Sequence, residues 1–149
     1  MSRAYLDGLV AGTVTTPAVV RRLLLPPPTA WAYGSLTAAF CPDEEVTLSV
    51  GIVFGGYIGC LVDHFAGLAM MTVLPDALTF LTAEIALGFR APLRPGPTDV
   101  TATVSGLSRR QATVEVVLSQ DGSPTSRATV EQVMVRRPVS PLAEPVAVG

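Results

Sequence analysis

The sequence predicts an α+β fold in which one antiparallel sheet is wrapped around one long helix. Three features of its 149 residues favour this class. One long apolar segment with helical character begins at Gly55, the hydrophobic pattern changes to a period of two after Pro75, and turn residues separate the alternating segments that follow. Because one helix cannot cover a sheet this apolar, we expect the sheet to continue into a partner subunit. The length and the 49% of apolar residues fit a single domain, residues 1–149.

We expect the first 28 residues to form a helical appendage to this domain. Thr16 resembles a helix N-cap, and Pro17 suits the first helical position. Residues 18–25 would continue this helix for about two turns. The three prolines at 26–28 end it, because proline cannot continue a helix.

One strand and one long helix are predicted for the middle of the chain. Residues 31–40 form the strand, and a polar break then leads into an apolar approach segment at 46–53. The helix extends from Gly55 to about Thr72. Its apolar residues surround most of its surface, which implies burial on several sides. Pro75 ends it.

Four strands are predicted after the helix, at residues 79–92, 99–107, 112–119 and 126–136. Asp121-Gly122 predicts a tight hairpin between the last two strands, since this dipeptide accepts the positive φ angles that such turns need. The alternation in the last strand changes phase between Val130 and Val133, which indicates a β-bulge there. Residues 138–149 are rich in Pro and Ala and are expected to form a flexible tail.

The composition excludes several kinds of chemistry. The chain contains no Lys, no Asn and one histidine, His64. A Lys Schiff base, a multi-His metal site and N-glycosylation are therefore excluded, and we expect neither a metal nor a cofactor. A net charge of −2, with ten basic against twelve acidic residues, leaves no basic surface for nucleic acid. The high apolar content also excludes a disordered chain.

No feature of the sequence predicts export or a membrane span. Residues 1–15 lack the charged start and long apolar core of a signal peptide. Residues 46–74 are long and apolar enough to cross a bilayer, but Asp63 and His64 lie in their middle, where ionisable groups are costly. The two cysteines lack the spacing of a metal site or a disulfide framework and are expected to be buried thiols. We therefore expect a cytoplasmic protein that does not enter a membrane.

Two features of the long helix carry candidate chemistry. Asp63 lies eight residues into an apolar helix, where a buried and unpaired carboxylate is costly. It is either a catalytic carboxylate or an aspartate paired with hydroxyls or arginine at a subunit interface. Gly55 and Gly56 open the helix and leave backbone N–H groups at its positive end. Either these groups stabilise an oxyanion, or the glycines serve close backbone packing.

These residues carry a resemblance to a known family. Gly51-Ile52-Val53-Phe54-Gly55-Gly56, followed after six residues by Asp63, resembles the G-x-x-H-G-G signature and helix carboxylate of hotdog-fold acyl-CoA thioesterases of the phenylacetate-pathway (PaaI-like) type. Leu61-Val62-Asp63 is similar to the L-x-D core of that family, and residues 82–96 are similar to its second strand. The resemblance covers residues 33–137.

The resemblance implies a hotdog fold and the hydrolysis of an acyl thioester carried by CoA or by a carrier protein. In such a site Asp63 would act as general base or nucleophile, and the Gly55 N–H would polarise the thioester carbonyl. Thr82 matches the hydroxyl residue that helps to hold water beside the carboxylate. The family builds each site from two subunits, with the glycine from one and the carboxylate from the other, so the resemblance implies a homodimer or homotetramer.

The sequence departs from the family signature at two positions. Phe54 stands where the signature has His, and Leu48 stands where many members have a polar Asn. These apolar groups imply slow hydrolysis or a substrate that is apolar near its carbonyl. Phe54, Gly56, His64 and Arg90 are the expected substrate contacts. His64 would line the acyl channel or act as a second acid or base, unless it is an interface histidine held by hydrogen bonds. Arg90 would contact the phosphates of CoA, unless it is a solvated arginine at a strand end.

Two other functions stay open at this point. A hotdog hydratase or dehydratase would act on an unsaturated acyl thioester through addition chemistry, and it would need a separated histidine and carboxylate, whereas His64 directly follows Asp63. A hotdog dimer that binds an acyl ligand without turnover would also be consistent with the two apolar replacements in the signature.

Overall fold

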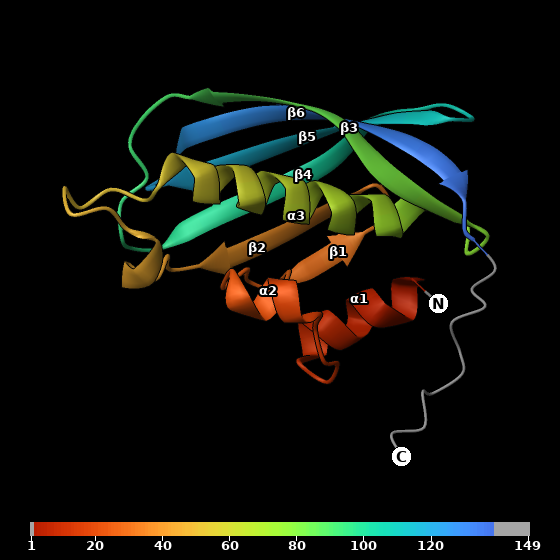
Figure 1. Cartoon of the computed structure of the whole chain (residues 1–149), viewed down its shortest axis with the longest axis horizontal. Coiled ribbons are helices and arrows are strands. Elements are labelled where there is room, and N and C mark those ends of the chain that lie inside the picture. The colour runs from red at the N-terminus through yellow and green to blue at the C-terminus, as the bar shows by residue number, and fades with distance from the viewer. Residues whose placement is uncertain (1, 139–149) are drawn as a thin grey trace, which may run out of the picture.

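A six-stranded antiparallel sheet curves around one long helix in the computed structural model of the protein, which describes residues 2–138 (Figure 1). The elements in chain order are α1 (Ser2–Ala11), α2 (Ala18–Arg22), β1 (Ala30–Ala32), β2 (Ser35–Phe40), a 3-10 turn (Glu44–Val46), α3 (Gly55–Val73), β3 (Leu78–Phe89), β4 (Thr98–Leu107), β5 (Gln111–Gln120) and β6 (Ser123–Arg136). This architecture confirms the α+β class and the hotdog fold. The expected flexible tail, residues 138–149, lies outside the described residues except for Pro138.

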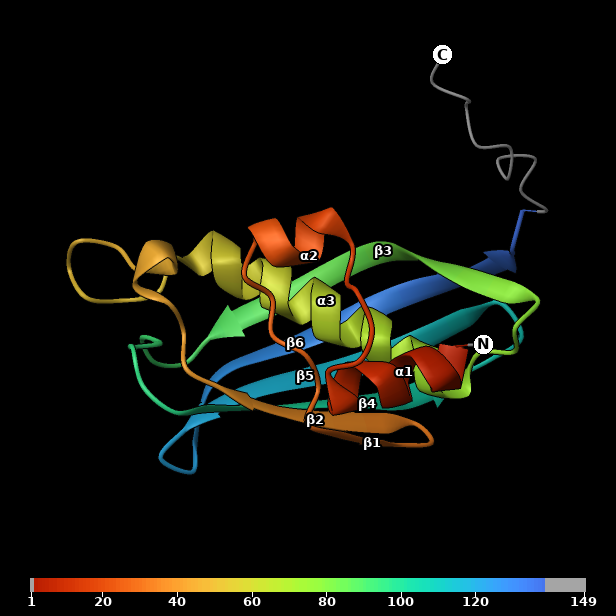
Figure 2. The ribbon, with the colours of Figure 1, turned by 90° about the horizontal axis from the view of Figure 1, so that it is seen from below.

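The strands follow the order β1-β2-β4-β5-β6-β3, and each neighbouring pair is antiparallel. Within the described chain β3 pairs only with β6, so one side of its 12 residues has no strand beside it. Figure 2 shows α3 along the inside of the curved sheet, with α1 and α2 beside it. The sheet therefore has one long open edge, formed by β3.

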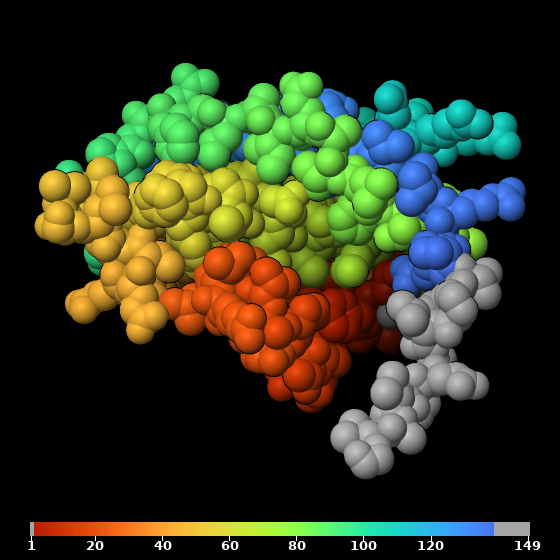
Figure 3. Space-filling model, in the orientation of Figure 1, coloured from red at the N-terminus to blue at the C-terminus, as the bar shows by residue number. Residues whose placement is uncertain are grey.

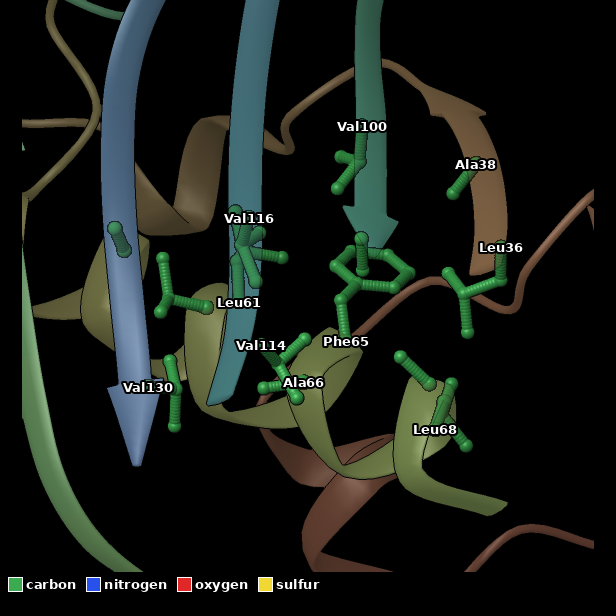
Figure 4. Close-up of a cluster of buried hydrophobic side chains, with 14 of the residues drawn as sticks. Leu36, Ala38, Leu61, Phe65, Ala66, Leu68, Val100, Val114, Val116 and Val130 are labelled. Atoms are coloured by element: carbon green, nitrogen blue, oxygen red, sulfur yellow. The ribbon is translucent and has the colours of Figure 1, made fainter. Parts of the chain in front are cut away.

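The buried face of α3 carries the core. Leu61, Phe65 and Ala66 are fully buried and lie against Val114 and Val116 of β5 (Figure 4). Removing one large apolar side chain from water contributes about 1.5–3 kcal/mol. This face therefore holds the helix on the sheet.

The bounds of α3 confirm the predicted long helix. It begins at Gly55 and ends at Val73, two residues before Pro75. Among the residues that the structure describes, it is the one helix long and apolar enough to cross a bilayer, but 61% of its apolar window is buried inside the protein. It is therefore the core helix of the fold, and no membrane span is indicated.

The N-terminal segment differs from the expected appendage. The sequence pattern does not predict α1, yet Leu6 and Leu9 of this helix are buried in the core. The second helix, Ala18–Arg22, is shorter than expected, and its N-cap is Pro17, one residue later than expected and without a side-chain cap. Because α1 packs against α3, tertiary contact stabilises a segment whose own pattern is weak. Residues 2–28 are thus part of the packed structure.

The later strands confirm the predicted alternation. β3 to β6 correspond to the four predicted ranges, with ends displaced by at most three residues. Asp121 and Gly122 have φ angles of 51° and 76°. Positive φ at both positions is the requirement of a tight two-residue hairpin, so the dipeptide forms the predicted turn.

The first strand and the β-bulge are corrected by the structure. The range predicted as one strand, 31–40, is a hairpin of β1 and β2 that turns at Gly34 with a φ of 82°, which glycine adopts without strain. The register of β6 is regular between Val130 and Val133, where the bulge was expected. It shifts instead in β3 between Thr82 and Glu84, in β4 between Val104 and Gly106, and near the start of β6 at Thr125. The phase change in the last strand has another cause, because the polar Gln132 occupies a fully buried position there.

Candidate active site

Asp63 lies on a stripe of small and polar residues along a side of α3 that the sheet leaves uncovered. The members of this α3 stripe are Gly56, Gly59, Cys60, Asp63, His64 and Gly67, all of them exposed or half-buried. Figure 3 shows α3 at the surface, with β3 above it and the N-terminal segment below it. The carboxylate is therefore open to a ligand or to a second protein chain.

Thr82 of β3 holds the carboxylate of Asp63. Its hydroxyl Oγ1 donates a hydrogen bond to Oδ1 of Asp63 at 2.7 Å. A β-bulge in β3 follows Thr82 directly, and bulges re-aim side chains next to functional sites. Because a hydroxyl has one proton to donate, this bond engages one carboxylate oxygen and leaves the other for a donor such as water. The structure thus brings together two of the predicted catalytic residues.

Gln132 lies behind Thr82, and the sequence pattern does not single it out as a site residue. Its side chain is fully buried, and its Oε1 lies 3.2 Å from Thr82 Oγ1. Its Nε2 is buried with no hydrogen-bond partner in the described chain, and such an unpaired donor is costly. The signal that could have found it is its place two residues after the buried Val130, where the alternation requires an inward side chain.

The N-terminus of α3 presents two open backbone donors. Phe54 is the N-cap and makes no side-chain cap hydrogen bond. In the described chain the Gly55 and Gly56 N–H groups have no acceptor, and the positive helix end favours an anion or a carbonyl oxygen there. Gly56 also serves close packing, because a Cβ at this position would lie 2.5 Å from the Phe54 ring.

The two halves of the predicted site are separated within one chain. Gly55 and Asp63 are eight residues apart in α3, which corresponds to about 12 Å along the helix axis. One carbonyl group is far too small to contact both. A site that uses both residues on one substrate therefore needs them from two different copies of the chain.

His64 is bonded to the N-terminal segment. Its Nε2 lies 3.0 Å from the carbonyl oxygen of Pro26, and this nitrogen carries the hydrogen, because a carbonyl oxygen only accepts. The ring packs edge-on against Phe65 with centroids 5.0 Å apart. Burial lowers the pKa of His64 from its ordinary value of 6.5. These contacts favour a histidine held by hydrogen bonds over a second acid or base.

Two cavities adjoin the predicted site residues. Asp63 and His64 line a cavity of about 460 Å³, whereas Gly55 and Arg90 line another of about 430 Å³. Arg90 thus lies near the open helix end. In residues 2–138 no group of three or more His, Cys, Asp or Glu side chains could hold a metal ion. The two cysteines differ from the expectation of burial, because one is exposed and the other, Cys60, is half-buried.

Comparisons with known proteins agree on the fold and the family. A family model for the thioesterase superfamily matches residues 50–126. A phenylacetic acid degradation-related protein of thioesterase type from Ralstonia eutropha JMP134 is 26% identical over 87% of this chain and 98% of its own, with a TM-score of 0.76. A mutant thioesterase from Pseudomonas aeruginosa has 22% identity over 89% of this chain and 94% of its own, with a TM-score of 0.75. A thioesterase from Haemophilus influenzae has 17% identity over 88% of this chain and 90% of its own, with a TM-score of 0.76. No curated protein sequence matches the chain.

Proposed function

The chain belongs to the thioesterase superfamily, and on this premise we propose that it hydrolyses an acyl thioester in a site shared by two copies of the chain. The acyl group would be carried by CoA or by a carrier protein. The observation that carries the proposal is the hydrogen bond from Thr82 to Asp63 on an uncovered side of the core helix. Such a carboxylate is oriented and accessible, as a catalytic base must be.

In the proposed mechanism Asp63 acts as a general base. Thr82 fixes one carboxylate oxygen, and the other accepts a proton from a water molecule. The water oxygen bonds to the thioester carbonyl carbon while the Gly55 N–H of the second copy stabilises the negative charge that develops on the carbonyl oxygen. The carbon–sulfur bond then breaks, and the proton passes from Asp63 to the leaving thiolate. The products are a carboxylic acid and a thiol.

Apolar side chains surround the open N-terminus of α3, where the thioester carbonyl would bind. Leu48 and Phe89 line the cavity beside Gly55, and Phe54 covers Gly56. No polar side chain takes the orienting role there, so the chemistry depends on Asp63 and the backbone donor. Arg90 lines the same cavity and is proposed to contact phosphates of the carrier, for which arginine is well suited.

The open edge of β3 supports a dimer. Three large apolar side chains of this strand, Leu81, Ile85 and Phe89, are 61%, 39% and 56% exposed. A long, apolar edge strand with unpaired backbone groups is a template for another strand. We propose that β3 pairs antiparallel with β3 of a second copy about a twofold axis, as is usual for homodimers.

The α3 stripe agrees with this arrangement. Gly59 lies midway between Gly55 and Asp63 in the sequence, and a Cβ built on Gly59 would meet nothing within 4 Å. If two antiparallel α3 helices cross at Gly59, Gly55 of each copy comes opposite Asp63 of the other. Glycine at the crossing point permits a close approach of the two backbones.

The experiment that tests this function is thiol release from a panel of acyl-CoA and acyl-pantetheine thioesters. We expect release with the wild-type chain, and its absence for all thioesters would reject the proposal. Two inactive variants then test the shared site. Gly55→Pro removes the backbone donor at a position where proline is tolerated, and Asp63→Asn removes the base.

Mixed dimers of these two variants give a distinct result. Each heterodimer contains one site with both defects and one intact site. After unfolding and refolding of an equal mixture we expect about a quarter of the wild-type activity, whereas each variant alone stays inactive. A mixture that stays inactive would show that the two groups act from one chain or not at all.

The structure weakens the hydratase alternative. That chemistry needs a separated histidine and carboxylate, but His64 is bonded to the Pro26 carbonyl and has a lowered pKa because of burial. A change in enoyl absorbance without thiol release would support it. An acyl ligand that co-purifies with an inactive wild-type protein would instead support the binding-only alternative.

A further inference from the structure

A cavity of about 460 Å³ lies between the N-terminal segment and the α3 stripe. Asp63 and His64 line it from α3, and Phe80 lines it from β3. In Figure 2 the chain from α1 through α2 passes over α3. The cavity therefore adjoins the carboxylate that we propose as the base.

The walls of the cavity are mainly apolar. Leu9, Val20 and Leu68 are among the side chains that line it. Arg21 is its one basic lining residue apart from the histidine, and its guanidinium donates a hydrogen bond to the carbonyl oxygen of Thr16. An apolar acyl group would be desolvated favourably against these walls.

Two side chains of α3 form hydrogen bonds to the part of the N-terminal segment that forms the opposite wall of the cavity. The Tyr57 hydroxyl donates to the carbonyl oxygen of Leu24 at 2.6 Å, and His64 Nε2 donates to that of Pro26 at 3.0 Å. Tyr57 and His64 are seven residues apart and thus lie on the same side of the helix. Burial raises the pKa of Tyr57 to about 12, which keeps it protonated as a donor. The wall is therefore fixed before any ligand enters.

We propose that this cavity receives the acyl group of the substrate, so that the N-terminal segment sets the substrate's size and polarity. The proposal rests on the proposed hydrolysis at Asp63 and names its substrate class, an apolar aliphatic or aromatic acyl group. If each non-hydrogen atom with its hydrogens takes about 30 Å³, as a water molecule does, the cavity holds at most about fifteen such atoms. Medium-length acyl groups fit, and longer ones must extend beyond it.

The cavity is tested by the binding of S-alkyl pantetheine thioethers. Pantetheine is common to CoA and to carrier proteins, and a thioether has no carbonyl to hydrolyse. By calorimetry we expect the affinity to rise by up to about fourfold per methylene as the chain grows to about twelve carbons, and then to level off. An affinity that does not depend on chain length would overturn the proposal.

A matched pair of variants in α2 locates the bound chain. Val20→Trp places an indole in the cavity, whereas Val19, its neighbour in α2, is 58% exposed and lies outside the lining, so Val19→Trp is the control. For the dodecyl thioether we expect at least a tenfold loss of affinity with Val20→Trp and no change with Val19→Trp. The ethyl thioether should bind all three proteins equally. Equal effects of the two variants would contradict the assignment.

The thioester assays separate this proposal from the function on which it rests. Chain-length-dependent binding without thiol release would reject hydrolysis and retain the cavity as an acyl site. Thiol release combined with binding that does not depend on chain length would reject the cavity and retain hydrolysis.

A second inference concerns the buried amide of Gln132. Its Oε1 faces the Thr82 hydroxyl at 3.2 Å, but the one proton of that hydroxyl is donated to Asp63 at 2.7 Å. Two acceptor oxygens therefore face each other, while the Nε2 of Gln132 has no partner in the described chain. A half-turn of the amide exchanges its oxygen and nitrogen with almost no change in shape.

We infer that Gln132 donates from Nε2 to Thr82 Oγ1, and that Thr82 donates in turn to Asp63. This orientation gives the buried amide nitrogen a partner and commits the Thr82 proton to the carboxylate. Gln132 is then a positioning residue, since it acts on Asp63 through Thr82.

The composition of the chain makes this inference accessible to NMR. With no Asn and only three Gln, residues 111, 120 and 132, the spectrum contains three side-chain NH₂ pairs. Gln132→Met identifies the pair of interest, and Gln120, whose Nε2 donates to the Arg94 carbonyl oxygen at 2.7 Å, is the internal reference. We expect Thr82→Val to shift the Gln132 pair and Thr82→Ser to restore it. A pair that does not move in Thr82→Val would overturn the inference, whether or not the protein hydrolyses thioesters.

Discussion

The two sides of α3 show how one helix serves stability and chemistry separately. On the buried face, Leu61 and Phe65 are fully enclosed by the sheet. On the α3 stripe, small residues leave room around Asp63, and the contacts there are single hydrogen bonds to Thr82 and to the N-terminal segment. Substitutions on the first side should therefore change the free energy of unfolding, and substitutions on the second should change activity with the fold intact.

The largest effect on stability is expected for Phe65→Ala. The side chain is fully buried, so its removal leaves a cavity in the core and should lower the free energy of unfolding by about 3–5 kcal/mol. Chemical denaturation measures this change. The control is Val50→Ala, at a side chain that is 71% exposed, for which we expect a change within about 0.5 kcal/mol. Equal losses in both variants would contradict the role of the buried face of α3 in stability.

The largest effect on activity is expected for Asp63→Asn. Loss of the base should lower kcat/KM by about 10²- to 10⁴-fold, and the free energy of unfolding should change by less than about 1 kcal/mol because the side chain is exposed. Steady-state thiol release and denaturation on the same preparations measure both. Asp99→Asn, at an exposed position of β4, is the control and should retain full activity. Activity that survives in Asp63→Asn would exclude the proposed mechanism.

A smaller effect is expected for Thr82→Val, which keeps the shape of the side chain and removes the hydrogen bond to Asp63. We expect kcat to fall by about tenfold with little change in KM, since the carboxylate remains but is no longer oriented. Thr82→Ser retains the hydroxyl and should keep most of the activity. If Ser and Val behave alike, the methyl group and not the hydroxyl matters at this position.

The smallest expected effect is a pH dependence of stability from His64. Burial lowers the pKa of this histidine in the folded chain from its ordinary value of 6.5. The unfolded chain therefore binds the proton first as the pH falls, and the contribution of His64 to stability is complete above about pH 6.5 and is lost as the pH falls through the folded pKa. Denaturation curves between pH 7.5 and 5 should show a declining free energy of unfolding.

His64→Gln is the matched variant for this prediction. It retains an N–H donor for the Pro26 carbonyl and has no titrating group. The part of the decline that comes from His64 should be absent in this variant, and a slope identical to that of the wild type would assign the pH dependence to other residues.

Most regular elements could be predicted because their determinants are local. The apolar segment after Gly55 and the proline at 75 determine where α3 begins and ends. Asp121-Gly122 forms the predicted hairpin because both residues accept positive φ angles. By contrast, α1 has few apolar residues on one face, and its burial depends on contact with α3. No local pattern reports such a contact.

The candidate site could be predicted only in part. The resemblance in the sequence pointed to Asp63, Gly55 and Thr82, and the structure places Thr82 on Asp63. It also places a bulge in β3 directly after Thr82, and Gln132 lies behind the pair. Residue polarity alone assigns Gln132 to the surface, and only its position two residues after the buried Val130 indicates the inner face.

By itself the sequence determined the α+β class, the long helix and the identity of the carboxylate and glycines on it, because helical and strand periodicities and turn residues act over a few neighbouring positions. Only the tertiary structure decided which groups meet. His64 reaches Pro26 across 38 residues and Thr82 reaches Gln132 across 50, and the N-terminal segment closes a cavity over the helix. These contacts depend on how elements distant in the chain pack together, and packing is decided by the whole fold.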